Sequence, residues 1–238
     1  MNSPMLPIVS TMQLLISVTT IEEADIALEN GADIIDLKDP NRGALGALPI
    51  SAIQAIVTHV KNKTQGSSKL TSATIGDLPM QADLLLKHVA LLVTTGVDII
   101  KIGFFETDNY QSCLKALQSM TQAGVKLIAV LFAENHYPET LIRAIKEAGF
   151  IGIMLDTANK NGATLLDYYS SEQRTQFAAA VFSHGLQLGL AGSLKLQHID
   201  VLREVNPTYI GFRGGVCDAD NRQLSLDAHK IKLISKTM

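Results

Sequence analysis

Two lysines in the chain stand among apolar residues. Lys38 follows the run Asp33-Ile-Ile-Asp-Leu37, and Lys101 is flanked by isoleucines in Ile99-Ile-Lys-Ile102. An ammonium group in an apolar setting loses solvation, which lowers its pKa and favours the neutral amine. A neutral amine attacks carbonyl carbons to form a Schiff base, or it accepts a proton. The two lysines therefore predict amine chemistry on a small aldehyde or ketone.

Carboxylates accompany both lysines. On an extended strand, Asp36 and Lys38 face the same side because they are two residues apart. Asp156 ends another apolar run and is followed by Lys160. Carboxylates beside lysines keep the amines protonated when required, or they move protons themselves. Three alternatives stay open: a surface ion pair at Asp36, an outward-pointing Lys101, and a helix cap at Asp156.

Two glycine-containing segments near the C-terminus are typical of phosphate-binding loops. Glycine lets backbone N–H groups approach phosphate oxygens, and a helix N-terminus adds partial positive charge. An arginine in such a loop is expected to add a bidentate contact to the phosphate. Glycines also serve as plain turn residues, so each segment alone is weak evidence. The predicted phosphate-binding residues are Gly192, Ser193, Arg213, Gly214 and Gly215.

Other common catalytic groupings are absent from the sequence. The 6 histidines have no metal-ligand spacing, and Cys113 and Cys217 form no CxxC pair. The turn at residues 18–21 lacks the GxGxxG pattern of dinucleotide-binding folds. The predicted site therefore needs no metal and no cofactor. Asp77, which follows a glycine, is predicted to cap the next helix.

The elements that position these residues follow a regular alternation. Short aliphatic runs alternate with amphipathic stretches, as in βαβ units. Before several runs the chain carries a glycine that ends the preceding helix in a left-handed turn. These glycines are Gly31, Gly96, Gly124 and Gly149. The predicted strands are Gln13–Val18, Asp33–Lys38, Leu70–Ile75, Val97–Ile102, Val125–Leu131, Phe150–Leu155, Leu186–Leu190 and Thr208–Phe212.

Eight buried parallel strands predict a single (β/α)₈ barrel of the TIM-barrel class. The active site of such a barrel lies at the C-terminal ends of the strands, where the residues named above fall. The competing fold is an open doubly wound sheet, which usually has a glycine-rich first turn. The predicted organisation is an N-terminal extension over residues 1–11 and one catalytic barrel domain over residues 12–238.

Composition narrows the expected partners. The chain has 238 residues, of which 47% are hydrophobic, and a formal net charge of -3. Without a basic field, neither nucleic acid nor an anionic membrane is an expected partner. No signal peptide is evident, and no apolar run reaches the roughly 18 residues of a membrane span. We expect a cytoplasmic protein that acts on a small molecule and forms homo-oligomers.

The strand-end motifs resemble a known family. They are Asp33-Ile-Ile-Asp-Leu-Lys-Asp-Pro40, Ser72-Ala-Thr-Ile-Gly-Asp77, Ile100-Lys-Ile-Gly103, Met154-Leu-Asp-Thr-Ala-Asn-Lys-Asn-Gly162, Ala191-Gly-Ser193 and Arg213-Gly-Gly-Val-Cys217. In this order they are similar to the (5-formylfuran-3-yl)methyl phosphate synthase family, from about Leu14 to the C-terminus. The resemblance implies a class I aldolase-like barrel. Such an enzyme condenses two molecules of glyceraldehyde 3-phosphate, with loss of phosphate and water, into the furan precursor of methanofuran.

The resemblance also implies a role for each predicted catalytic residue. Lys38 would form the Schiff base and Lys101 would accept protons, while Asp36, Asp156 and Lys160 would assist proton transfer. The family's substrate would be a triose phosphate. The N-terminal extension and a shorter loop at residues 132–138 depart from the family pattern, so the binding site of the second substrate stays undefined.

Two other functions stay open. The first is another class I aldolase, or a metal-free isomerase, that acts on a small phosphorylated sugar. The second is a barrel that has lost catalysis and serves as a binding or assembly subunit. The second predicts decay of the charged residues at the strand ends, and these residues are present.

Overall fold

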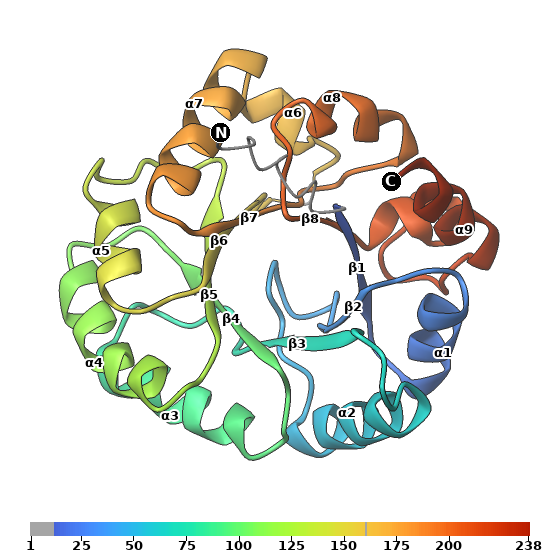
Figure 1. Cartoon of the computed structure of the whole chain (residues 1–238), viewed down its shortest axis with the longest axis horizontal. Coiled ribbons are helices and arrows are strands. Elements are labelled where there is room, and N and C mark those ends of the chain that lie inside the picture. Colours follow the sequence, from blue (N-terminus) through green and yellow to red (C-terminus); the bar gives the residue numbers. More distant parts are fainter. Residues whose placement is uncertain (1–11, 160) are drawn as a thin grey trace, which may run out of the picture.

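The computed structural model describes residues 12–159 and 161–238 of the chain. Within them, parallel strands close into one barrel in sequence order (Figure 1). The strands are β1 (Gln13–Val18), β2 (Ile34–Leu37), β3 (Leu70–Thr74), β4 (Ile99–Phe104), β5 (Leu127–Phe132), β6 (Gly152–Asp156), β7 (Gln187–Leu190) and β8 (Tyr209–Phe212). The prediction of a single (β/α)₈ barrel is confirmed.

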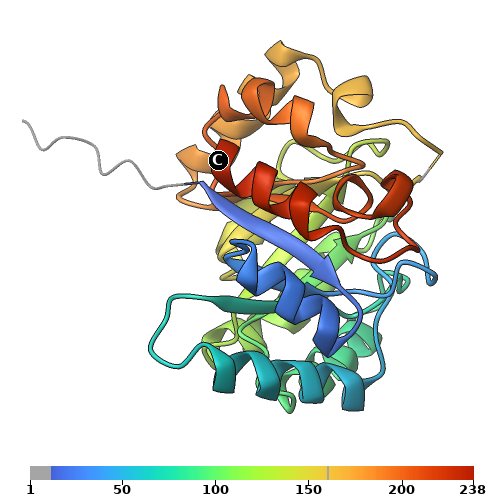
Figure 2. The same ribbon diagram turned by 90° about the vertical axis from the view of Figure 1, so that its right-hand side faces the viewer.

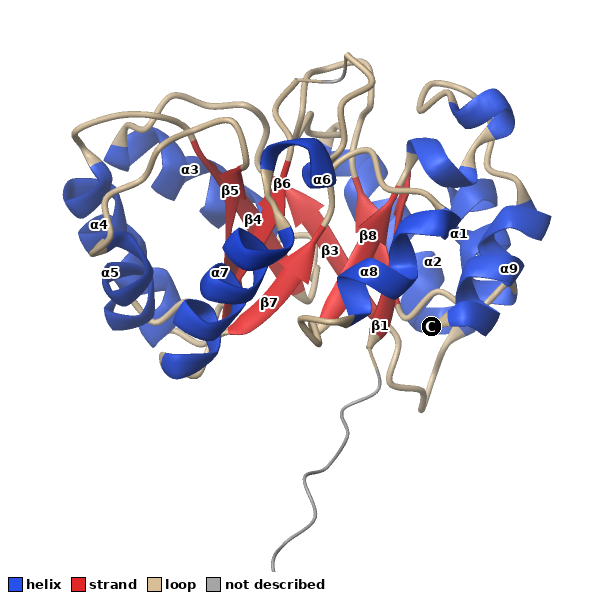
Figure 3. Cartoon of the chain, turned by 90° about the horizontal axis from the view of Figure 1, so that it is seen from above, coloured by secondary structure: helices blue, strands red, loops and turns tan. Residues whose placement is uncertain are grey.

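Helices surround the barrel and connect its strands (Figure 3). The α-helices are α1 (Ile21–Glu29), α2 (Ile50–Lys63), α3 (Ala82–Val93), α4 (Tyr110–Gln122), α5 (Leu141–Glu147), α6 (Leu165–Tyr168), α7 (Ser171–Ser183), α8 (Ile199–Arg203) and α9 (Ala228–Thr237). Short 3₁₀ helices are η1 (Leu196–His198), η2 (Gly214–Val216) and η3 (Asp218–Asp220). β1 pairs with β8 and α9 lies against α1, which closes the ring (Figure 2).

The predicted glycine turns bring the chain back from helix to strand. Gly31, Gly96, Gly124 and Gly149 have φ angles of 106°, 74°, 88° and 83°. These values lie in the left-handed region, which glycine enters without steric cost. The turns return each chain segment to the start of the next strand, so all strand C-terminal ends meet at one face of the barrel.

The inward-facing side chains change from apolar to polar along the barrel. Leu15, Ile34, Ile128 and Tyr209 belong to one buried apolar cluster, which also reaches Phe132 at the C-terminal end of β5. One step further along neighbouring strands, the register places Ser17 level with Asp36 and Asp36 level with Ser72. Burial of an aliphatic side chain contributes about 1.5–3 kcal/mol. The layer of Ser17, Asp36 and Ser72 therefore packs on buried apolar side chains that stabilise the barrel.

β4 extends further than its sequence pattern indicates. The predicted strand covered residues 97–102, whereas the observed strand ends at Phe104 and pairs there with Leu131 of β5. Asp98 lies before the strand and its carboxylate accepts hydrogen bonds from the amide and hydroxyl of Thr71. Lys101 therefore lies in the middle of β4 rather than at its end.

The prediction that Asp77 caps the following helix is wrong. Gln81 occupies the N-cap of α3, and the Asp77 carboxylate accepts hydrogen bonds of 2.8 Å from the amides of Ala44 and Leu45. These bonds hold the β2–α2 loop over the barrel, where Leu45 is buried against the inner cluster. The loop that follows Lys38 is thus fixed by a residue from the end of β3.

The predicted extension at residues 1–11 lies outside the described residues. In the two described ranges, the helices are too short or too polar to cross a bilayer. Assembly into homo-oligomers stays a prediction.

Candidate active site

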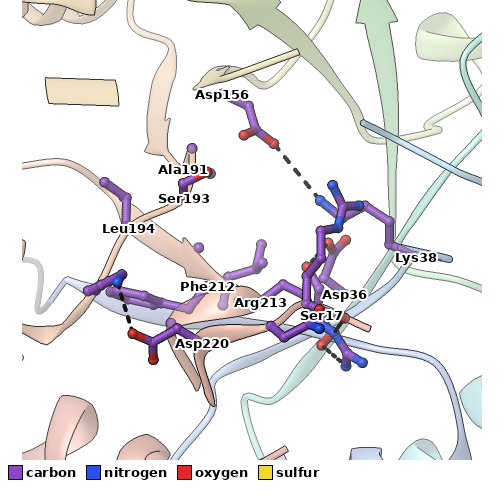
Figure 4. Close-up of a pocket in the computed structure, with 18 of the residues that line it drawn as sticks. Ser17, Asp36, Lys38, Asp156, Ala191, Ser193, Leu194, Phe212, Arg213 and Asp220 are labelled. Atoms are coloured by element: carbon purple, nitrogen blue, oxygen red, sulfur yellow. Dashed lines mark hydrogen bonds and ion pairs between the residues drawn. The ribbon is translucent and has the colours of Figure 1, made fainter. Parts of the chain in front are cut away.

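A cavity of about 390 Å³ opens at the C-terminal ends of the strands. Its volume is within the usual range of small-molecule sites. Lys38, Lys101, Asp36 and Asp156 all line it (Figure 4 labels Lys38 and the two carboxylates). The two lysines therefore face the same cavity, and the outward-pointing alternative for Lys101 is excluded.

Lys101 and Asp36 form a fully buried ion pair. Lys101 Nζ lies 2.7 Å from Asp36 Oδ1, and the two side chains are 2% and 0% exposed. The hydroxyls of Ser17 and Ser72 donate to the same carboxylate at 2.9 and 2.7 Å. Burial raises the pKa of Asp36, but the charges of Lys101 and Lys38 and the hydrogen bonds from Lys101 and Ser72 hold it below its usual value. The carboxylate stays ionised and keeps an ammonium group close.

Lys38 and Asp156 lie further apart. Lys38 Nζ is 3.9 Å from Asp156 Oδ2, which is beyond hydrogen-bonding distance (Figure 4). Asp156 Oδ1 accepts a hydrogen bond of 2.7 Å from the amide of Thr157. The ion pair between Lys38 and Asp156 is therefore longer than the one between Lys101 and Asp36.

The barrel pairs each lysine with a carboxylate from a different strand. Asp36 and Lys38 do share the inner side of β2, as the period of two predicts. Asp36, however, reaches Lys101 on β4, and Lys38 reaches Asp156 on β6. The surface alternative for Asp36 is excluded because its side chain is fully buried. Lys160 lies outside the described residues.

The loops after β7 and β8 bring the predicted glycines into this cavity. Gly192, Ser193, Gly214 and Gly215 all line it. In the described chain, the amides of Ser193, Gly214 and Gly215 have no protein acceptor. Backbone N–H groups that line a cavity without a protein acceptor are suited to donate to a phosphate oxygen. The loops therefore offer donors for an oxyanion.

Close packing between these loops also requires glycine. A Cβ atom on Gly192 would lie 2.8 Å from Thr157 Cγ2, and one on Gly215 would lie 2.2 Å from the carbonyl oxygen of Leu194. Real Cβ atoms do not approach that closely. The loop after β7 thus packs at Gly192 against Thr157, which follows β6, and the loop after β8 packs at Gly215 against the loop after β7.

Arg213 lines the cavity, but its guanidinium holds the protein rather than facing a ligand. It forms a bidentate ion pair with Glu23 at 2.6 and 3.0 Å. Its other N–H groups donate to the carbonyl oxygens of Ser17, Arg222 and Leu224 at 3.1, 2.9 and 3.2 Å. A guanidinium has five donors, and these contacts use all of them. In this arrangement no donor is left for the phosphate contact expected of Arg213.

The chain matches the family described as 4-HFC-P synthase over residues 14–235. The chain belongs to this family. A Methanocaldococcus jannaschii protein named (5-formylfuran-3-yl)methyl phosphate synthase is 34% identical over 222 residues, which cover 89% of this chain and 92% of that protein. A Methylorubrum extorquens protein provisionally given the same name is 42% identical over 219 residues, covering 92% and 88%. The resemblance seen in the strand-end motifs is confirmed.

Solved structures share the barrel of this 4-HFC-P synthase family member. Phosphoribosyl anthranilate isomerase from Thermococcus kodakaraensis matches with a TM-score of 0.66 at 16% identity, covering 95% of this chain and 98% of that one. 3-hexulose-6-phosphate synthase from Salmonella typhimurium matches with a TM-score of 0.63 at 18% identity, covering 94% and 97%. At such identities the likeness shows the fold alone.

Four residues of this 4-HFC-P synthase family member were not singled out from the sequence. Ser17 and Ser72 hold Asp36 in place, and their only signal was a hydroxyl within a buried strand. Lys195 and Arg222 line the cavity from loops. Cations are common in loops, so no sequence pattern distinguishes these two residues.

Proposed function

We propose that this protein is a lyase that makes (5-formylfuran-3-yl)methyl phosphate for methanofuran biosynthesis. It condenses two molecules of glyceraldehyde 3-phosphate, with loss of one phosphate and of water. The family assignment and the names of the relatives support this reaction. The observation that carries it is the pair of lysines in one cavity, each at a different distance from a carboxylate.

Substrate binding begins at the loops after β7 and β8. The amides of Ser193, Gly214 and Gly215 hold the phosphate of one triose through their N–H groups. Lys38 projects into the same cavity from β2, away from these loops (Figure 4). Binding at the loops places this triose beside the second triose, whose carbonyl Lys38 attacks, which replaces a chance encounter by a fixed geometry.

Lys38 acts as the nucleophile in this scheme. Its neutral amine attacks the carbonyl carbon, and loss of water gives an imine. The imine draws electrons from the neighbouring carbon, so a proton leaves that carbon more easily. Asp156, 3.9 Å from the Lys38 nitrogen, receives or returns protons during imine formation and hydrolysis. Lys160 assists these transfers.

Lys101 moves protons in this scheme. As an ammonium it protonates an oxygen that leaves the substrate, and as the resulting amine it removes a proton from carbon. Asp36 stays ionised beside it and favours the return of the ammonium form. Ser17 and Ser72 keep the carboxylate hydrogen-bonded in both states of the lysine.

The test is product analysis with glyceraldehyde 3-phosphate as the sole substrate. We expect the furan aldehyde phosphate by mass spectrometry and equal amounts of furan and released inorganic phosphate. A Lys38→Met protein prepared in parallel controls for contaminating enzymes. Isomerisation or simple aldol addition without phosphate release would contradict the proposal and favour an aldolase or isomerase acting on a phosphorylated sugar.

A further inference from the structure

Arg222 is a second guanidinium at the cavity, and its contacts differ from those of Arg213. Its Nη2 donates to the carbonyl oxygen of Gly43 at 3.0 Å, and its Nε is buried without a hydrogen-bond partner. Among residues 12–159 and 161–238, no carboxylate forms an ion pair with it, whereas Glu23 pairs with Arg213. Most donors of Arg222 are therefore available to a ligand.

The backbone that carries Arg222 is fixed. Arg213 Nε donates to the carbonyl oxygen of Arg222 itself at 2.9 Å. A few residues earlier, the Asp220 carboxylate forms ion pairs of 2.9 Å with Lys195 and 2.7 Å with Lys230. The loop that carries the guanidinium is therefore held in place. Arg222 loses little conformational entropy when it binds a ligand. Arg213 therefore helps to position Arg222, because its Nε and Nη2 donate to the carbonyl oxygens of Arg222 and Leu224.

The charge of Arg222 is incompletely compensated. Burial lowers the pKa of Arg222, and so does the charge of Arg213, whereas the charges of Asp156, Asp77 and Asp39 act in the opposite direction. A partly buried guanidinium without a direct counter-ion is stabilised when an anion arrives. Phosphate fits this need, since it accepts two parallel hydrogen bonds from the guanidinium fork.

We propose that Arg222 binds the phosphate that leaves during the reaction, while the amides of Ser193, Gly214 and Gly215 keep the phosphate that stays in the product. This assignment rests on the proposed function. Arg222 contacts Gly43, which lies in the loop that follows Lys38, so it stands on the Lys38 side of the cavity mouth. The cavity would then hold two phosphates at separate places, one for each triose.

The elimination of phosphate is consistent with the position of Arg222. In glyceraldehyde 3-phosphate, the aldehyde carbon C1 becomes the imine carbon on Lys38. The phosphate ester oxygen is bonded to C3, two positions away. A base removes the proton from the carbon between them, and that electron pair forms a carbon–carbon double bond. The carbon–oxygen bond breaks and its electrons leave with the phosphate. Arg222 stabilises the negative charge that grows on the departing group.

The first test uses inorganic phosphate as the probe and isothermal titration calorimetry of the full chain. We expect two phosphate sites in the wild type and one in Arg222→Gln, with the remaining site unchanged within about twofold. Arg42→Gln is the matched control, because Arg42 lies in the neighbouring loop and its side chain is 67% exposed. This variant should keep both phosphate sites.

One site in the wild type, two sites in Arg222→Gln, or loss of both sites in that variant would each overturn the assignment.

The second test separates this assignment from the proposed function. With glyceraldehyde 3-phosphate, Arg222→Gln should release phosphate about 10²-fold more slowly, the usual scale for loss of a charge-stabilising donor. Borohydride should still trap the substrate on Lys38, and Arg222→Lys should recover part of the rate. If the wild type makes no furan, the proposed function fails while the phosphate titration still decides the role of Arg222. Wild-type phosphate release by Arg222→Gln would overturn the assignment alone.

Discussion

The two lysine–carboxylate pairs of the cavity differ in distance and in surroundings. Lys101 lies 2.7 Å from a carboxylate that two serines also hold, and both partners are buried. Lys38 lies 3.9 Å from its carboxylate, and its side chain is 9% exposed. The two lysines thus have different environments, because the nearest carboxylate lies closer to Lys101 than to Lys38. The difference supports proton transfer at Lys101 and nucleophilic attack at Lys38.

The supports of the two pairs differ as well. The Lys101 pair is built entirely on β1 to β4, where paired strands fix every donor and acceptor. Lys38 begins the β2–α2 loop, which depends on the hydrogen bonds from its amides to Asp77. The first pair should therefore matter more for stability, and the second should matter more for the position of the reacting group.

Replacing the nucleophile should have the largest effect on activity. In the proposed mechanism, Lys38→Met removes the amine that forms the imine, so we expect furan formation to fall by about 10⁴-fold or more, the scale seen when a covalent nucleophile is removed. Stability in urea should change little. Activity within about tenfold of the wild type would remove Lys38 from the centre of the mechanism.

Replacing the proton-transfer lysine should break both activity and stability. Lys101→Met leaves Asp36 buried without its counter-ion, which costs about 3–5 kcal/mol of unfolding free energy. Activity should fall by about 10²–10⁴-fold. Urea unfolding and product formation measure the two effects.

A double variant sharpens this prediction. Asp36→Leu combined with Lys101→Met removes both charges, so most of the stability should return while the activity stays lost. If Lys38→Met and Lys101→Met reduce the unfolding free energy equally, the contrast between the two pairs is wrong.

The unfolding free energy at acidic pH should depend on the ionisation of Asp36. Its pKa in the folded protein lies below the usual value, so the ionised carboxylate stabilises the fold at pH values above about 3.9, the pKa of an unperturbed aspartate. That contribution is lost as the pH falls through the folded pKa. The difference in unfolding free energy between the wild type and Asp36→Asn should be constant above about pH 5 and narrow below about pH 3.9. A difference that grows on acidification would contradict this interpretation.

Loosening the loop after Lys38 should have the smallest effect. Asp77→Asn weakens two charge-assisted hydrogen bonds to the loop, and we expect a cost of about 1–2 kcal/mol. Activity should fall by roughly tenfold because Lys38 is held less firmly. Asp200→Asn is the control, since that carboxylate is 84% exposed and its ion pair is worth about 0–1 kcal/mol. Equal effects of the two substitutions would remove the special role of Asp77.

The barrel was predictable from the sequence because buried parallel strands are short aliphatic runs. The residues at which the strands end were harder to predict from the sequence. β4 continues to Phe104 because β5 offers it a partner there, and Asp98 stays outside because it hydrogen-bonds to Thr71. Such cross-strand pairing is invisible in a local pattern. The cap expected of Asp77 failed for the same reason, since its true partners lie more than thirty positions away in the sequence.

The candidate site was predictable in its residue types but not in its pairing. The period of two correctly placed Asp36 and Lys38 on one side of a strand. The contact between Asp36 and Lys101 depends on the register of β2, β3 and β4, which the sequence does not reveal. Arg213 binds Glu23 across 190 positions, so its donors could not be known to be occupied.

Borohydride trapping followed by peptide mass analysis tests whether Lys38 forms the Schiff base. Glyceraldehyde 3-phosphate is added to the wild type, Lys101→Met and Lys38→Met, and the reduced adduct is located on the chain. We expect an adduct on Lys38 in the first two proteins and none in the third. An adduct on Lys101, or the lack of one on Lys38 in the wild type, would contradict the proposed role of Lys38.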